Sequence, residues 1–304
     1  MKAAAALMRF AAVILITVIL GSAQIGCGSG GTQSVRDNTE TLHQRPEEWF
    51  YDSFDPVKKA AYDAFRIAAE NPFDEEPVPI RNEEGETASI SIKDLDEAYQ
   101  GFLYDHPEVF WLSRTYRYRA AADSGQEEFA DAVAVVPLSE SEEDLNNRKK
   151  EFEIAASGFL QEIEDSDNDK DRAAAIYDKI ASQTLYEGEA LYDDSYESGH
   201  TAYSVVTGKR GVCDGIALAY KYLLSECGIR CIVIPGESEG TAHVWNTVYW
   251  DDSWHEADLT WDTASEGNDS MQYFDLSTEE MNKDHSREKE GIALAIPRSS
   301  ERSD

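Results

Sequence analysis

Basic residues are scarce in this chain of 304 residues, which carries 27 Lys and Arg against 60 Asp and Glu. Proteins that bind nucleic acids neutralise the phosphates with basic patches, and the sequence contains no such patch. We therefore expect no nucleic-acid partner. The formal net charge of −33 is explained more simply by a solvated acidic surface than by an acidic ligand site.

Cysteine is also rare, with four residues in the whole chain. Cys27 lies near the N-terminus, and Cys213, Cys227 and Cys231 lie in the part that we expect to fold. Three cysteines do not provide the disulfide framework that holds small secreted domains together. We interpret Cys227 and Cys231 as small buried side chains, with a disulfide between them as the alternative. At least one thiol is then expected to be free.

The N-terminus contains no apolar run of the about 20 residues that a membrane-spanning helix needs. Its apolar run, Phe10 to Leu20, follows the basic residues Lys2 and Arg9 and precedes several small residues. A short basic segment, an apolar segment and small residues are typical of a signal peptide, which we place at residues 1–26.

Ile25-Gly26-Cys27 resembles a bacterial lipobox, in which the cysteine is lipidated, although Gln24 stands where lipoboxes usually carry Leu. Residues 27–46 are rich in small polar side chains and read as a flexible tether. We therefore expect the domain to lie outside the cytoplasm, anchored to the cell membrane through a lipid on Cys27. Secretion after ordinary signal cleavage and retention of the segment as an uncleaved anchor are the alternatives.

The remainder divides into three segments. Residues 47–165 are expected to form a helical region with some strands, which includes a helix capped by Asp55-Pro56. Residues 166–285 carry the chemistry described below. Residues 286–304 read as a polar C-terminal tail without a functional interpretation.

Cys213 opens the most informative stretch. The sequence GVCDG at residues 211–215 leads into an amphipathic run that ends at Gly228, a residue type expected just after a helix. Cys213 is thus predicted at the N-terminus of a buried helix, where free N–H groups and the helix dipole lower the pKa of a thiol. Gly211 and Gly215 are expected to leave room for a substrate backbone.

A short strand, Ile229 to Ile234, follows and is expected to stop at Pro235-Gly236. A hairpin comes next, with Asp251-Asp252 as its turn, so that Trp250 pairs with Ser253.

This register would pair His243 with Thr260, and it places His243 and Asp258 on one face as diagonal neighbours within side-chain reach. His255 falls on the opposite face, which argues against a metal site built from His243, His255 and Cys213. A thiol, an imidazole and a carboxylate in this order are the parts of a cysteine acyl-transfer site. Asp262 is the rival for the acid.

The same stretch resembles the transglutaminase-like superfamily, through GVCDGIALAYKYLLSECGIRCIVIPG and HVWNTVYWDDSWHEADLTWD. The resemblance implies an α+β fold with a papain-like core, one central helix packed on an antiparallel sheet, beside the mixed N-terminal region. It assigns Cys213 as nucleophile, His243 as base and Asp258 as orienting acid. Tyr203 and Trp245 are candidates for oxyanion stabilisation or substrate contact. The resemblance implies neither a metal nor another cofactor.

The resemblance implies a thiol enzyme that acts on amide bonds of a protein or peptide, with hydrolysis favoured. Two alternatives stay open. The acyl-enzyme could be resolved by an amine, as in glutamine–lysine crosslinking, or the fold could be a surface binding module with an idle site.

Overall fold

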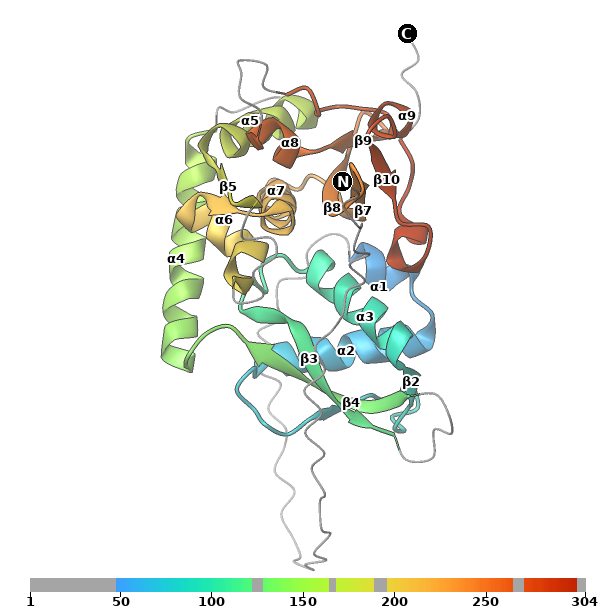
Figure 1. Ribbon diagram of the computed structural model, residues 1–304. Coiled ribbons are helices and arrows are strands. Elements are labelled where there is room, and N and C mark those ends of the chain that lie inside the picture. The colour runs from blue at the N-terminus through green and yellow to red at the C-terminus, as the bar shows by residue number, and fades with distance from the viewer. Residues whose placement is uncertain (1–47, 122–127, 164–167, 189–195, 265–270, 300–304) are drawn as a thin grey trace, which may run out of the picture.

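The computed structural model describes residues 48–121, 128–163, 168–188, 196–264 and 271–299. The predicted signal peptide, the tether and Cys27 lie outside these ranges. Within them, no helix has the length and apolar content that crossing a bilayer requires. Figure 1 shows an N-terminal half, with the chain coloured blue to green, and a C-terminal half, coloured yellow to red, packed against each other.

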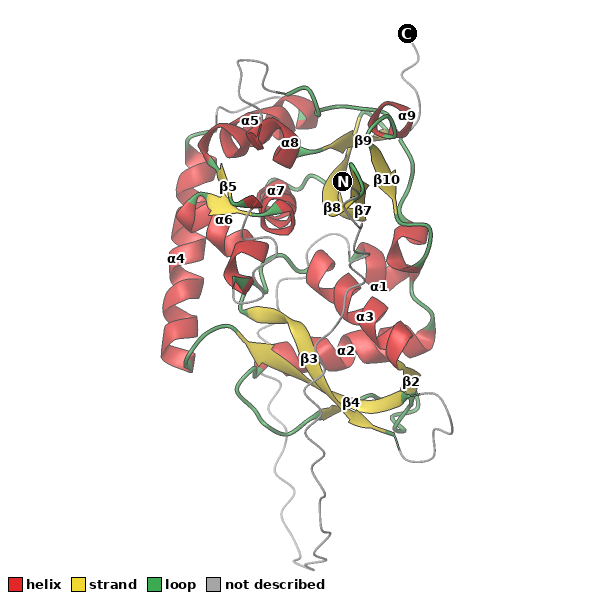
Figure 2. Cartoon of the chain, viewed as in Figure 1, coloured by secondary structure: helices red, strands yellow, loops and turns green. Residues whose placement is uncertain are grey.

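The N-terminal half packs helices on one side of an antiparallel sheet (Figure 2). Strands β1, β4 and β2 lie in this order, and β3 also pairs with β4. As predicted, Asp55 caps α2, since its side chain accepts hydrogen bonds from the N–H groups of Val57 and Lys58. The elements are α1 (Trp49–Ser53), α2 (Pro56–Glu70), β1 (Val78–Pro79), β2 (Ile90–Ser91), α3 (Ile92–Asp105), β3 (Leu112–Ala120) and β4 (Phe129–Pro137).

The C-terminal half places the buried helix α7 against the antiparallel sheet β10-β7-β8-β9. This is the predicted α+β core with one central helix. Its elements, with α4 running along one side, are α4 (Glu142–Gln161), α5 (Asp169–Gln183), β5 (Leu185–Tyr186), η2 (Glu197–His200), α6 (Ala202–Gly208), β6 (Arg210–Gly211), α7 (Cys213–Glu226), β7 (Cys231–Ser238), β8 (Thr241–Trp250), β9 (Ser253–Ala257), α8 (Leu259–Ala264), α9 (Thr278–Met281), β10 (His285–Arg287) and η3 (Gly291–Ala295).

The hairpin of β8 and β9 has the predicted register. Trp250 pairs with Ser253, and the pairing continues to Asn246 opposite Ala257. Both turn residues have positive φ, 48° at Asp251 and 58° at Asp252, as the favoured two-residue hairpin turn requires. The predicted pairing of His243 with Thr260 is wrong, because the chain leaves the sheet and starts α8 at Leu259.

Strand β7 does not stop at Pro235-Gly236, contrary to the prediction. Pro235 pairs with Val244 and Gly236 with His243. On its other side the carbonyl of Pro235 accepts a hydrogen bond from Glu288 at 3.1 Å. A Cβ at Gly236 would lie 2.4 Å from the carbonyl oxygen of Ser286, so glycine is needed for β10 to approach.

The predicted boundary between residues 285 and 286 is also wrong, because it cuts through β10. His285, Ser286 and Arg287 pair with β7, and η3 then packs against α1 and α3. Trp49 closes this contact, since its indole N–H donates to the carbonyl of Ala295 at 3.0 Å. The segment is therefore part of the fold as far as residue 299.

A buried carboxylate joins the two halves. One oxygen of Asp105, at the end of α3, accepts hydrogen bonds from the N–H groups of Phe50 (3.0 Å) and Tyr51 (3.1 Å) and from the hydroxyl of Tyr62 (3.1 Å). Its other oxygen lies 3.6 Å from the ammonium of Lys221 on α7. Because both side chains are buried, each charge depends on the other for compensation.

Replacing Asp105 by Ala is expected to destabilise the protein by about 3 kcal/mol, because it leaves Lys221 as an unpaired buried charge. Urea unfolding followed by tryptophan fluorescence measures this. Asp52→Ala, which removes an exposed carboxylate on α1, is the control and should change stability by less than about 0.5 kcal/mol. Equal unfolding midpoints for the two variants would show that the buried pair does not hold the halves together.

Candidate active site

Cys213 is the first residue of α7, as predicted, with Val212 in an extended conformation before it. The glycines around it serve a different purpose from the one expected. A Cβ added to Gly211 would lie 3.0 Å from the carbonyl oxygen of Gly199, and one added to Gly215 would lie 2.4 Å from the same oxygen. That carbonyl also accepts a hydrogen bond from Val212 at 3.1 Å. The space predicted for a substrate backbone is therefore filled by η2.

His243 and Asp258 form the second part of the site. The imidazole Nε2 lies 2.7 Å from Oδ2 of Asp258, and both side chains are buried. The other carboxylate oxygen accepts a hydrogen bond from the Thr260 N–H at 2.8 Å. Burial alone would raise the pKa of Asp258, but the charge and hydrogen bond of His243, together with those of His285, hold it well below its usual range.

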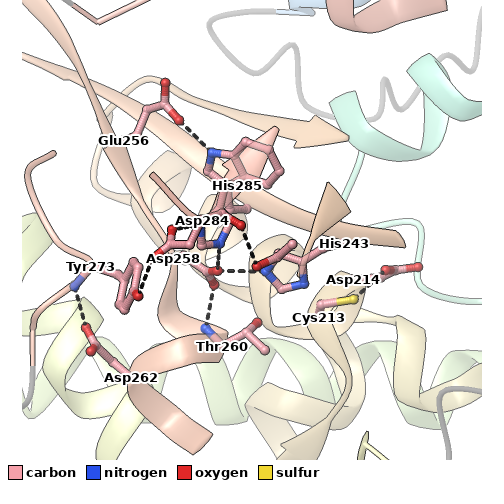
Figure 3. A network of polar contacts seen from close by, with 12 residues as sticks. Cys213, Asp214, His243, Glu256, Asp258, Thr260, Asp262, Tyr273, Asp284 and His285 are labelled. Atoms are coloured by element: carbon pink, nitrogen blue, oxygen red, sulfur yellow. Dashed lines mark hydrogen bonds and ion pairs between the residues drawn. The ribbon is translucent and has the colours of Figure 1, made fainter. Parts of the chain in front are cut away.

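The thiol and the imidazole lie next to each other. The backbone N–H of Val244 acts on the Cys213 sulfur and lowers the pKa of its thiol, and Val244 directly follows His243 on β8. Figure 3 shows the imidazole of His243 between Asp258 and Cys213. The three residues thus occur in the order that a nucleophile, its base and an orienting acid require.

Asp262, the rival acid, is bound elsewhere. It accepts hydrogen bonds from the hydroxyl of Tyr177 at 2.5 Å and from the N–H groups of Tyr273 (3.1 Å) and Gln272 (3.2 Å). The structure thus brings Asp258 to His243, while Asp262 is bound by Tyr177 and by backbone N–H groups.

The thiol does not have the environment predicted for it. Cys213 is 2% exposed, and its sulfur donates to Oδ1 of Asp214 at 3.3 Å. Burial, and after it the negative charge of Asp214, raise the pKa of Cys213 well above its usual value. The expectation of a lowered pKa is therefore wrong for this conformation, because burial and the neighbouring carboxylate both disfavour the thiolate.

Asp214 belongs to a second polar network on the other side of the thiol. Its Oδ2 lies 2.9 Å from Nδ1 of His200 and 3.7 Å from the guanidinium of Arg114 on β3. Burial raises the pKa of Asp214, but His200 and then Arg114 outweigh it and bring the pKa to about 2. The N-terminal half thus reaches the site through Arg114, which sequence reasoning missed because no local pattern links the two.

Tyr203 is not part of this site. Its hydroxyl donates to Glu151 on α4 at 2.7 Å, and its ring stacks on Phe110 with centroids 4.7 Å apart. The structure therefore does not support its predicted role in oxyanion stabilisation or substrate contact.

Trp245 does lie beside the site, but its side chain is fully buried against His243. Its ring stacks on His243 with centroids 6.2 Å apart, and its indole N–H donates to Glu256 at 2.6 Å. Glu256 in turn pairs with Arg287 at 2.6 Å. With 1% exposure, Trp245 holds the imidazole in place and does not line a groove.

Sequence reasoning also missed His285, whose Nε2 lies 2.9 Å from the same Oδ2 of Asp258. The ligand atoms of His243, Asp258 and His285 lie within 4.8 Å of one another, and these residue types can bind zinc. Here the two imidazoles contact the carboxylate oxygen directly at hydrogen-bond distance, so a metal ion would have to displace both contacts. The geometry is that of a hydrogen-bonded cluster.

Several solved structures resemble the chain at low overall similarity. The crystal structure of a TGase matches with a TM-score of 0.35 and 18% identity, over 54% of this chain and 48% of the other. A candidate cysteine protease from Cytophaga hutchinsonii matches with a TM-score of 0.29 and 15% identity, over 48% of this chain and 62% of the other.

Two curated relatives match at the sequence level. The kyphoscoliosis peptidase of Mus musculus is 27% identical over 111 residues, 33% of this chain and 17% of the relative. That of Homo sapiens is 27% identical over 125 residues, 37% of this chain and 18% of the relative. The chain thus spans less than a fifth of the length of these relatives.

The family comparison agrees with the geometry. Residues 157–259 match the model of the transglutaminase-like superfamily, and this span contains Cys213, His243 and Asp258 on the elements described above. The chain therefore carries a domain of the transglutaminase-like superfamily.

Proposed function

We propose that the protein is a cysteine hydrolase of protein or peptide amide bonds, with Cys213 as nucleophile, His243 as base and Asp258 as orienting acid. The observation that carries this proposal is the buried pair of His243 and Asp258, 2.7 Å apart, beside a thiol at the start of α7. A carboxylate paired with an imidazole, with a thiol on the other side of the ring, is the arrangement that acyl transfer by a thiol requires (Figure 3).

In the proposed reaction the Cys213 proton passes to His243, and the sulfur attacks the amide carbonyl. The imidazolium returns the proton to the departing amine as the C–N bond breaks, which leaves a thioester. His243 then deprotonates a water molecule that attacks the thioester and regenerates the thiol. Asp258 stays ionised throughout and stabilises the imidazolium.

The buried state of the thiol adds a requirement. The sulfur must leave Asp214 and donate its proton to His243 before it can attack. Because Cys213 is 2% exposed, a substrate must also open the site. The same burial favours a second candidate function, a binding module with an idle thiol, which the experiments below separate from the first.

We further propose that the enzyme acts outside the cytoplasm, anchored through a lipid on Cys27, or secreted if the signal peptide is cleaved in the ordinary way. The support is the sequence pattern of residues 1–46. Release from membranes on Cys27→Ser, with the chain still exported, would distinguish lipid anchoring from secretion.

Cys213→Ala is expected to abolish turnover of peptide amides, and Asp258→Asn to lower kcat/KM by about 10³-fold or more, since it disturbs the imidazole that Asp258 orients. A peptide library digested by the full chain and read by mass spectrometry measures this. Cys227→Ala, which removes a half-buried thiol outside the site, is the control. Activity that survives Cys213→Ala would refute the assignment.

Adding a primary amine to the same digest separates the two acyl-transfer outcomes. We expect free carboxyl products with little amine conjugate. Predominant conjugation would identify a transamidase instead.

Asp214→Asn is expected to accelerate alkylation of Cys213 at pH 7 by about tenfold, because removing the carboxylate charge lowers the pKa of the thiol. Iodoacetamide labelling over a pH series, resolved by peptide mapping, measures this. Asp251→Asn neutralises an exposed carboxylate in the hairpin turn and should leave the labelling rate unchanged. Slower or equal labelling of the Asp214 variant, at unchanged unfolding midpoint, would contradict the expectation.

A further inference from the structure

His285 lies at the centre of a buried charge cluster that the three-residue site does not use. It is the first residue of β10 and pairs with Ser238 of β7, and its side chain is fully buried. Nε2 lies 2.9 Å from Oδ2 of Asp258, and Nδ1 lies 2.6 Å from Oδ1 of Asp284. Figure 3 shows His285 close to Asp258.

The two contacts determine the charge of the ring. An ionised carboxylate can only accept hydrogen bonds, and a neutral imidazole has only one N–H to donate. Because both nitrogens of His285 face a carboxylate oxygen, the doubly protonated ring satisfies both contacts. Burial lowers the pKa of His285, but the hydrogen bonds and charges of Asp258 and Asp284 outweigh this and raise it above the usual value.

The surroundings keep water away from this ring. Its centroid lies 5.1 Å from the ring of Trp245, 5.3 Å from that of Trp261 and 5.6 Å from that of Tyr273. The hydroxyl of Tyr273 also donates to Asp284 at 2.8 Å, which holds that carboxylate in place. Charge interactions are stronger where water is excluded.

A second imidazole, that of His243, lies beside His285, with ring centroids 5.5 Å apart. The two imidazoles share one oxygen of Asp258, at 2.7 Å and 2.9 Å. A positive charge on His285 therefore acts on His243 twice. It repels a protonated His243 directly, and it neutralises part of the carboxylate that would stabilise that proton.

We propose that His285 is a positively charged positioning residue that holds Asp258 and limits how strongly this carboxylate stabilises a protonated His243. Asp284, on the far side of the ring, keeps His285 charged. This inference rests on the proposed function, because it assigns His285 a part in tuning the base of that reaction. Without His285, more of His243 would be protonated at neutral pH, and less of it would be free to accept a proton.

The test is a histidine titration of the full chain, labelled with ¹³C at the Cε1 position of histidine and followed by NMR. In His285→Gln the amide N–H₂ can still donate to Asp258, but the positive charge is gone. We expect the titration midpoint of His243 to rise by about one pH unit, a tenfold gain in proton affinity. His255→Gln is the control. It changes a ring on the sheet face opposite to that of His243, so the titration midpoint of His243 should stay unchanged.

A midpoint of His243 that stays the same or falls in His285→Gln overturns the proposal. If that variant fails to fold, the wild-type spectrum decides, because His285 must be protonated at pH 7 and a neutral ring there refutes its charged role. Burial lowers the pKa of His255, so its resonance serves as the internal neutral reference. Neither readout needs turnover, so an inactive wild-type protein would refute the proposed function separately.

Discussion

The Asp258 carboxylate is the group on which the site depends. It is 1% exposed, and a buried anion is stable only if hydrogen bonds and opposite charges compensate it. Its donors come from three places in the fold, His243 on β8, Thr260 at the start of α8 and His285 on β10. The end of β9, the start of α8 and the C-terminal strand must all be in place for the imidazole to be oriented.

Asp214 is a second carboxylate in contact with an imidazole, that of His200. It faces the thiol directly, so its charge opposes ionisation of Cys213 more strongly than that of Asp258, which contacts His243. The thiol thus lies between two carboxylate–imidazole pairs. In this conformation it donates to Asp214.

The N-terminal half contributes charged side chains to the surroundings of the site and of helix α7. Arg114 reaches Asp214 from β3, and Asp105 pairs with Lys221 in the middle of the helix that starts at Cys213. The C-terminal segment also joins the parts, since β10 pairs with the sheet that carries His243 and η3 packs on the N-terminal helices α1 and α3. The protein therefore folds around one continuous core, and the site lies at the junction of its parts.

The sequence alone determined the central helix, its start at Cys213 and the hairpin register, because these follow from local periodicity and from a two-residue turn that fixes pairing. It did not determine the contacts between segments that are distant in the sequence. Gly215 admits the backbone of Gly199, Gly236 admits β10, and Asp214, Arg114 and His285 gain their roles from contacts across the fold. The pKa of Cys213 shows the difference most clearly, because the helix dipole is encoded locally, whereas burial and the neighbouring charges are decided by tertiary packing.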